Sequence, residues 1–137
     1  MANKIATILG VVFLLVGVAG FVLPGLLNTH LSLVHNIVHL VSGAVALWIG
    51  LKGSVSAAKT FCIVFGVVYL LLGIAGFVAG ADADPSTGVP GPHDARMFKV
   101  LPGTLELGTM DHAIHVLLGV VFLIGGFATK PAVVRTA

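Results

Sequence analysis

The chain has 137 residues, of which 58% are hydrophobic and only 9% are charged, and its mean hydropathy is +1.13. A chain of this composition has too little polar surface to cover a soluble globule, so soluble enzymes and soluble binding domains are excluded. The net charge is only +2 and no basic cluster with interleaved aromatic residues is present, so no nucleic-acid partner is expected.

Four apolar segments are each long enough to cross a hydrocarbon core of about 30 Å, which takes roughly 20 helical residues. They cover residues 5–23, 31–50, 60–80 and 110–128. Membrane-spanning barrel strands alternate polar and apolar residues, whereas these segments are apolar on every side. We predict an all-α protein of the lipid bilayer, folded as a bundle of four transmembrane helices.

The second half of the chain repeats the first. GVVFLLVGVAGFV at 10–22 recurs as GVVYLLLGIAGFV at 66–78, and IVHLVSGAVALWIG at 37–50 recurs as AIHVLLGVVFLIGG at 113–126. We predict a single domain over 1–137, made of a duplicated helical hairpin with one repeat at 5–50 and the other at 60–128. Because each repeat has two spans, both enter the membrane from the same side and the hairpins are parallel.

The repeats differ mainly by an insertion near residues 80–97, GADADPSTGVPGPHDARM, which is rich in proline, glycine and aspartate. This composition predicts an irregular loop in water. The stretch that follows, 95–108, contains VLPG, which matches the VLPG of the first hairpin's turn at 22–25. We therefore expect 95–108 to cap the bundle, although its mixed apolar and basic residues also suit the membrane surface.

Charge predicts the orientation. Five of the seven basic residues occupy the chain ends and the short second connection, namely Lys4, Lys52, Lys59, Lys130 and Arg135, and only Arg96 and Lys99 lie elsewhere. Acidic residues fall in or beside the other connections, namely Asp82, Asp84, Asp94, Glu106 and Asp111. Basic residues concentrate in cytoplasmic loops, so we expect both termini in the cytoplasm (N-in/C-in).

Small residues form a stripe along the first and third segments. The stripes consist of Ala6, Gly10, Gly17 and Gly20 in the first and of Cys62, Gly66, Gly73 and Gly76 in the third. At 3.6 residues per turn each set spans an arc of about 80°. Such stripes let membrane helices approach closely, so we interpret them as packing surfaces.

Histidines lie on the matching face of the second and fourth segments. His35 and His39 share an arc with Gly43 and Gly50, and His112 and His115 share one with Gly119 and Gly126. A ring that faced lipid would lack a hydrogen-bond partner, so these rings are expected to point at neighbouring helices. All six histidines, including His30 and His93, fall on the predicted outer side.

Several roles suit these histidines. Pairs four or three residues apart can bind one metal ion from a single helix face, which makes His35, His39, His112, His115 and the neighbouring Asp111 candidate ligands of a transition metal. His39 and His115 occupy equivalent positions in the two repeats and could ligate a haem or a chlorophyll-type pigment. The simplest alternative is that the rings hydrogen-bond between helices, and a fourth is a response to pH.

Other catalytic signals are absent from the sequence. It contains no phosphate-binding GxxxxGK loop, no GxSxG, no CxxC and no carboxylate at the centre of a segment. Cys62 is the sole cysteine, so no intramolecular disulfide can form. We expect no enzymatic activity.

An NxxHL element at 36–40 and a second histidine-bearing element at 114–123 are set among the glycine-rich repeats. In these elements the chain resembles a family of small bacterial four-helix membrane proteins of unknown function. The resemblance covers nearly the whole chain apart from the insertion, and it implies a multi-pass protein of the bacterial plasma membrane. No activity follows from it.

Two functions are consistent with these observations. The first is a non-enzymatic accessory or structural subunit that packs against a larger membrane complex, or against itself, through its glycine stripes and outer loops. The second is a histidine site on the extracytoplasmic side that takes a transition metal, a haem or a pigment.

Overall fold

The computed structural model describes residues 1–130, so Arg135 lies outside the described residues. The elements follow in the order α1 (Ala2–Ala19), a short 3-10 helix η1 (Leu26–Asn28), α2 (Leu33–Lys52), α3 (Val55–Ala79), β1 (Ala81–Ala83), β2 (Asp94–Leu101), β3 (Leu105–Leu107) and α4 (Thr109–Phe127). All four α-helices are long and apolar enough to cross a membrane. The predicted four spanning helices are confirmed.

Two helix boundaries differ from the predicted ones by four residues or more. α1 ends at Ala19, before the predicted end at Leu23, and a turn over residues 20–22 leads to Pro24, which has no N–H and disfavours helical geometry in the residue before it. α3 begins at Val55, before the predicted start at Thr60, because the Ser54 side chain accepts a hydrogen bond of 3.1 Å from the Ala57 N–H and caps the helix.

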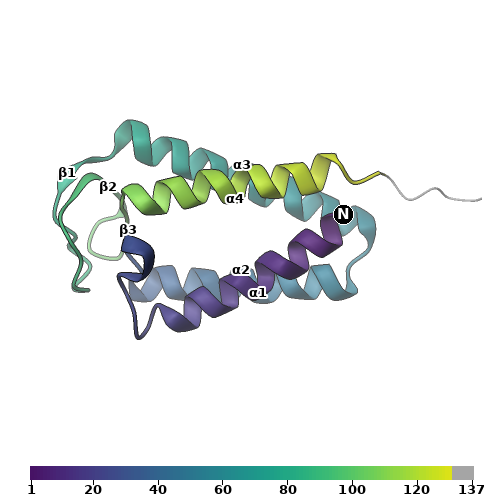
Figure 1. Cartoon of the computed structure of the whole chain (residues 1–137), viewed down its shortest axis with the longest axis horizontal. Coiled ribbons are helices and arrows are strands. Elements are labelled where there is room, and N and C mark those ends of the chain that lie inside the picture. Colours follow the sequence, from purple (N-terminus) through teal and green to yellow (C-terminus); the bar gives the residue numbers. More distant parts are fainter. Residues whose placement is uncertain (131–137) are drawn as a thin grey trace, which may run out of the picture.

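The helices form two close pairs, α1 with α2 and α3 with α4 (Figure 1). The N-terminus, the α2–α3 connection and the end of α4 lie together at one end of the bundle, which we call the terminal end. η1 and the three strands lie at the opposite end, which we call the strand end. Contacts between the two pairs are much sparser than contacts within each pair.

Glycines bring the two helices of each pair into backbone contact. A Cβ atom added to Gly10 would stand 2.6 Å from the Leu47 backbone nitrogen on α2, and one added to Gly119 would stand 2.6 Å from the Leu70 nitrogen on α3. Real Cβ atoms do not approach backbone atoms so closely. The small-residue stripes therefore pack against neighbouring helices as the sequence predicts.

We expect Gly10→Ala to lower the free energy of unfolding by about 1–3 kcal/mol, because the Leu47 backbone has to move to admit the methyl group. The ordinary gain of about 1 kcal/mol from replacing a helical glycine by alanine has the opposite sign and is outweighed. Unfolding in mixed detergent micelles measures the change. Gly25→Ala is the matched control, since a Cβ there meets nothing within 4 Å. Equal stability of the two variants would contradict the close approach of α1 and α2.

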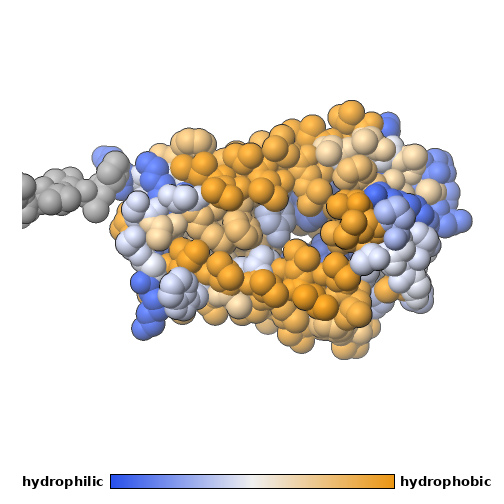
Figure 2. Space-filling view, turned by 180° about the vertical axis from the view of Figure 1, so that it is seen from behind, coloured by the Kyte–Doolittle hydropathy of each residue, from blue (hydrophilic) through white to orange (hydrophobic). Residues whose placement is uncertain are grey.

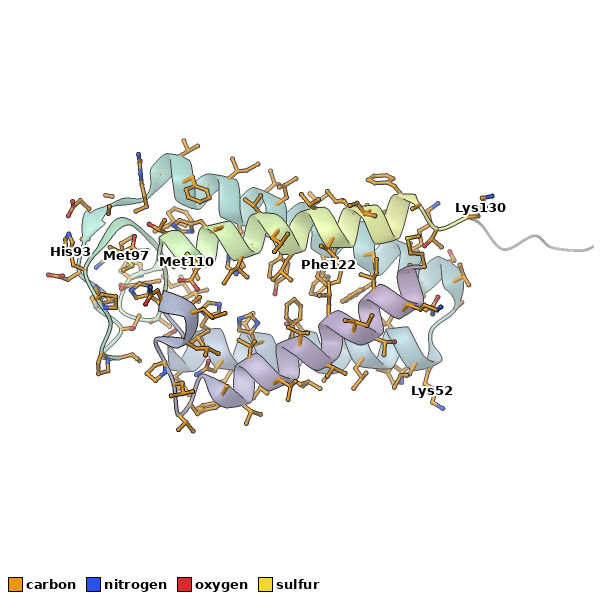
Figure 3. The ribbon with its side chains drawn as sticks, in the orientation of Figure 1. Lys52, His93, Met97, Met110, Phe122 and Lys130 are labelled. Atoms are coloured by element: carbon orange, nitrogen blue, oxygen red, sulfur yellow. The ribbon has the colours of Figure 1, made fainter. Side chains whose placement is uncertain are left out.

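Aromatic side chains join the two pairs in the middle of the bundle. Phe13 of α1 lies with its ring centroid 5.4 Å from that of Tyr69 on α3 and 6.0 Å from that of Phe122 on α4. All three residues are buried, and Figure 3 shows Phe122 pointing into the bundle. From here to the terminal end the core is filled mainly by small residues and phenylalanine, including Ala2, Ala6, Ala46, Ala58, Phe61 and Cys62.

The outer faces of the helices are apolar. Figure 2 shows hydrophobic residues over the long sides of the molecule and polar residues gathered at its two ends. Leu15, Val18, Leu71 and Leu117 are each about 60% exposed. Water does not tolerate such a surface on a soluble protein, so this band contacts the lipid bilayer.

A small antiparallel sheet covers the strand end, and it corrects two expectations: an all-α fold and a wholly irregular insertion. β2 pairs with β1 on one side and with β3 on the other. The β2–β3 turn is possible because Gly103 takes a positive φ of 73° directly after Pro102. Met97 and Leu107 are buried beneath the sheet, so the stretch 95–108 caps the bundle as expected.

Candidate functional site

The two helix pairs stand apart toward the strand end and leave space between them. A cavity of about 470 Å³ lies between α2 and α3, and a second of about 200 Å³ lies between α1 and α4. Figure 2 shows the molecule hollowed between the two pairs. The larger cavity falls within the range of about 300–1,000 Å³ that is common for small-molecule sites.

Three histidines line both cavities, namely His35, His39 and His115, which we call the histidine row. The ring centroids of His35 and His39 are 4.6 Å apart, and those of His35 and His115 are 6.0 Å apart. Each side chain is at least nine-tenths buried within the protein. The prediction that these rings point inward instead of toward lipid is confirmed.

The rest of the larger cavity is almost wholly apolar. Tyr69 packs edge-on against His115 with ring centroids 5.2 Å apart, on the side toward the aromatic core. Leu105 and Leu107 of β3 line the cavity at the strand end. Further apolar wall comes from α2 and α3, including Val38, Val45, Phe65 and Leu72.

The protein fixes the hydrogen position on one ring of the row. His35 Nδ1 lies 2.9 Å from the carbonyl oxygen of His30, and a carbonyl can only accept. His35 therefore donates from Nδ1, and its neutral ring has Nε2 left as an acceptor.

The other two rings of the row lack partners at Nδ1. The Nδ1 atoms of His39 and His115 are buried without a hydrogen bond to any described residue. Buried polar atoms are nearly always paired, so an unpaired one calls for an explanation such as a bound ligand or water.

His112 belongs to a different environment from the row. Its Nε2 donates to the Arg96 carbonyl oxygen at 2.7 Å, and its ring packs edge-on against Phe77. The ring fills the space that a side chain at Gly76 of α3 would need. His112 therefore ties α4 to α3 and to the capping sheet, away from the cavities.

Asp111 is a structural link between the two helix pairs. Its Oδ2 accepts from the Gly108 N–H at 2.8 Å, which caps α4, and from the His30 N–H at 3.0 Å in the segment that leads into α2. Its side chain is 2% exposed. Asp94 adds a second carboxylate at the start of α4, where Thr109 donates to it from both its backbone and its hydroxyl.

His30 faces hydrogen-bond acceptors on both sides of its ring. Nδ1 lies 3.5 Å from Asp111 Oδ2, and Nε2 lies 3.4 Å from the Pro92 carbonyl oxygen. The Asp111 carboxylate beside Nδ1 raises the pKa of His30 above 6.5, against the opposing effect of burial. The Pro92 carbonyl and the charges of Asp111 and Asp94 act in the same direction.

A raised folded-state pKa has a definite consequence for stability. The charged ring contributes stability fully below the unfolded pKa of about 6.5, and this contribution is lost as pH rises through the raised folded pKa. We therefore expect the melting temperature in nanodiscs to fall as pH increases from 6.5 into the alkaline range. His30→Gln should reduce this slope, whereas Lys52→Gln, at an exposed site, serves as the control. A slope unchanged by His30→Gln would contradict the assignment.

His93, the sixth histidine, lies on the exposed outside of the strand end (Figure 3). Its Nδ1 is 3.0 Å from Asp84 Oδ1, and its Nε2 is 2.5 Å from Asp82 Oδ1. The hydrogen bond to Asp84 and the charge of Asp82 raise the pKa of His93. Because the two carboxylates hold opposite ring nitrogens, they fix the loop and do not converge on one point.

The structure thus brings together only part of the predicted metal set. His35, His39 and His115 line both cavities, and Asp111 lines the smaller one, where its Oδ2 already accepts from two backbone N–H groups. His112 is engaged elsewhere, with the Arg96 carbonyl. Within residues 1–130, no three histidine, cysteine or carboxylate side chains stand close enough to hold a metal ion. The capacity of these residues to bind a metal stays a prediction.

Sequence reasoning missed the non-histidine part of the site. Tyr69 stands at the position equivalent to Phe13 of the first repeat and is the only tyrosine. This difference between the repeats was the sequence feature that could have identified it as part of the site. No sequence pattern pointed to Leu105 and Leu107, because their place at the cavity depends on the capping sheet.

These features define a multi-pass integral membrane protein with four spanning helices and a histidine-lined cavity between its helix pairs. Residues 3–128 match the family described as Domain of unknown function (DUF4383), and the chain belongs to that family. No curated protein and no solved structure is significantly similar to the chain.

Proposed function

We propose that the protein binds a lipid-soluble small molecule between its two helix pairs, with the polar group of that molecule at the histidine row. The observation that carries the proposal is the presence of three buried imidazoles, two of them with unpaired Nδ1 atoms, around a cavity whose other lining residues are apolar apart from Ser42 and Tyr69. Apolar walls with a few convergent polar groups are the usual composition of small-molecule sites.

Several alternatives to a bound ligand are less well supported. Hydrogen bonding within the protein pairs Nε2 of His112 and Nδ1 of His35, but it leaves His39 and His115, like His112, without partners at Nδ1. A bound metal would require side-chain movement, since ligand nitrogens lie about 2.0–2.1 Å from zinc. A haem or pigment held by His39 and His115 stays a candidate identity of the bound molecule.

Retention of a molecule during purification tests the proposal. The protein is isolated in mild detergent, and its visible spectrum, its metal content and the molecules released by organic solvent are determined. We expect one organic molecule per chain, lost in His39→Leu and His115→Leu and kept in the surface control His93→Leu. An absorption band near 400 nm lost in the same variants would identify a haem. Identical extracts from wild type and both row variants would contradict the proposal.

The accessory-subunit role predicted from the sequence is a separate proposal. The exposed apolar faces do not favour it, because lipid covers such faces equally well. Co-migration of the protein with a larger complex on a native gel after mild solubilisation would support it, and migration as a single small species would count against it.

We also propose a duplicated architecture with both termini in the cytoplasm of a bacterial cell. Leu47 contacts Gly10 and Leu123 contacts Gly66, and these four residues occupy equivalent positions of the two repeats, which supports the duplication. Lys52 and Lys130 lie at the terminal end, opposite His93 (Figure 3), and this distribution fits a cytoplasmic terminal end. The histidine row would then lie toward the extracytoplasmic side.

A further inference from the structure

The hydrogen-bonding pattern of the row restricts the chemistry of its ligand. His35 Nδ1 is committed to the His30 carbonyl, so a neutral His35 can only accept at Nε2. A ligand that satisfies His35 must therefore carry a hydrogen-bond donor. Ketones, esters, ethers and hydrocarbons have none.

His39 and His115 can supply the hydrogen-bond donor that a neutral His35 cannot offer at Nε2. Each neutral imidazole has one N–H and one lone pair, and no described residue pairs with Nδ1 of either ring. Either ring can therefore donate an N–H to an oxygen that also donates to His35. A hydroxyl group does both at once, since it is one donor and two acceptor lone pairs.

The spacing of the rings suits a single oxygen atom. A hydroxyl oxygen lies about 2.7–3.0 Å from each hydrogen-bonded ring nitrogen. The ring centroid of His35 lies 4.6 Å from that of His39 and 6.0 Å from that of His115, so each neighbouring ring stands within about twice the length of such a hydrogen bond. His112 cannot bind such an oxygen through Nε2, because this atom already donates to the Arg96 carbonyl oxygen.

The charge of the walls points to an uncharged ligand. The residues that line the larger cavity include no lysine, arginine, aspartate or glutamate. Asp111 lines the smaller cavity, but its Oδ2 already accepts from two backbone N–H groups. An unpaired charged headgroup would be costly at this depth.

We propose that the cavity selects a neutral, lipid-soluble molecule with a hydroxyl group, an alcohol or phenol whose O–H donates to His35 Nε2 and whose oxygen accepts from His39 or His115. This inference rests on the proposed function and adds the ligand class to it. The apolar part of the molecule occupies the larger cavity between α2 and α3.

The two isomers tridecan-1-ol and dodecyl methyl ether provide the probes. They have the same atoms and almost the same length, but only the alcohol has an O–H. Tyr69 reports binding, because it lies against His115 and is the only tyrosine. Trp48 is the only tryptophan and is 66% exposed, so Trp48→Phe removes its emission without touching the cavity.

The Trp48→Phe protein in nanodiscs is titrated with each isomer, and the change in Tyr69 emission is compared at equal mole fraction in the bilayer. We expect the alcohol to bind at least tenfold more tightly than the ether, the equivalent of about 1.4 kcal/mol. Adding His35→Phe should remove the preference by weakening alcohol binding, whereas adding His93→Phe should leave it intact.

Nitrogen NMR of the histidine-labelled protein provides a second measurement that does not depend on the stability of a variant. We expect His35 to carry its hydrogen on Nδ1, and its Nε2 resonance to shift with the alcohol and not with the ether.

Equal binding of the two isomers, or a preference unaffected by His35→Phe, would overturn the inference and leave the proposed function standing. If the protein retains an extractable molecule but binds neither probe, the inference is likewise overturned and the proposed function stands. Binding of neither probe, with no extractable molecule, would overturn both.

Discussion

Replacing Phe122 with alanine is expected to lower the free energy of unfolding by about 3–5 kcal/mol, the range seen for large aromatic residues removed from a packed core. Phe122 is 0% exposed, and its ring lies within about 6 Å of those of Phe13, Phe61 and Tyr69. Its ring contacts aromatic rings of both α1 and α3. Because lipid is as apolar as phenylalanine, the loss reflects packing and the cavity left behind, not exposure to water.

Unfolding of the Phe122→Ala protein in mixed micelles, with increasing sodium dodecyl sulfate, measures this loss. Phe127→Ala is the matched control, since Phe127 is on the same helix and is 69% exposed. The control should change stability by no more than about 0.5 kcal/mol. Similar losses in the two variants would show that the aromatic core does not join the helix pairs.

Replacing Asp111 with alanine is expected to cost about 2–5 kcal/mol. The substitution leaves the N–H groups of His30 and Gly108 without their acceptor, and each buried unpaired group costs about 1–3 kcal/mol. The α4 N-terminus also loses a carboxylate that opposes its positive dipole end. Since His30 belongs to the first helix pair and Asp111 to the second, the strand end should loosen as a whole.

Hydrogen exchange of the backbone amides distinguishes this loosening from general unfolding. In Asp111→Ala, exchange should accelerate at residues 28–32 and at the start of α4, and much less near the terminal end. Asp111→Asn should show a smaller effect, because the amide oxygen can still accept. Asp82→Ala, at an exposed carboxylate, is the control. Uniform acceleration along the chain, or none, would contradict a local link.

The sequence contained enough information to predict the helices and the faces they bury. Uninterrupted apolar segments identify the spans because the lipid interior allows no unpaired backbone group. His39 and Gly43 fall on one face by helical periodicity alone, and both are buried as predicted.

The sheet and the chemistry of the site were beyond such reasoning. β2 pairs with β1 across the proline-rich loop and with β3 across a short turn, and these pairings depend on long-range contacts that composition does not encode. His35 and His112 look alike in sequence, yet His112 turns toward α3 and the sheet, where Arg96 supplies an acceptor. The tautomer of His35 follows from the path of the backbone at His30, which only the fold determines.

Mapping where a photoreactive long-chain alcohol attaches in the membrane tests the central claim, a ligand site between the two helix pairs. α3 offers an internal comparison, because Tyr69 and Leu72 line the larger cavity whereas Val64 and Leu71 are more than half exposed on its outer side. We predict saturable labelling at Tyr69 and Leu72 that is lost in His35→Phe. Labelling that never saturates and is confined to Val64, Leu71 and other lipid-facing residues would contradict the claim.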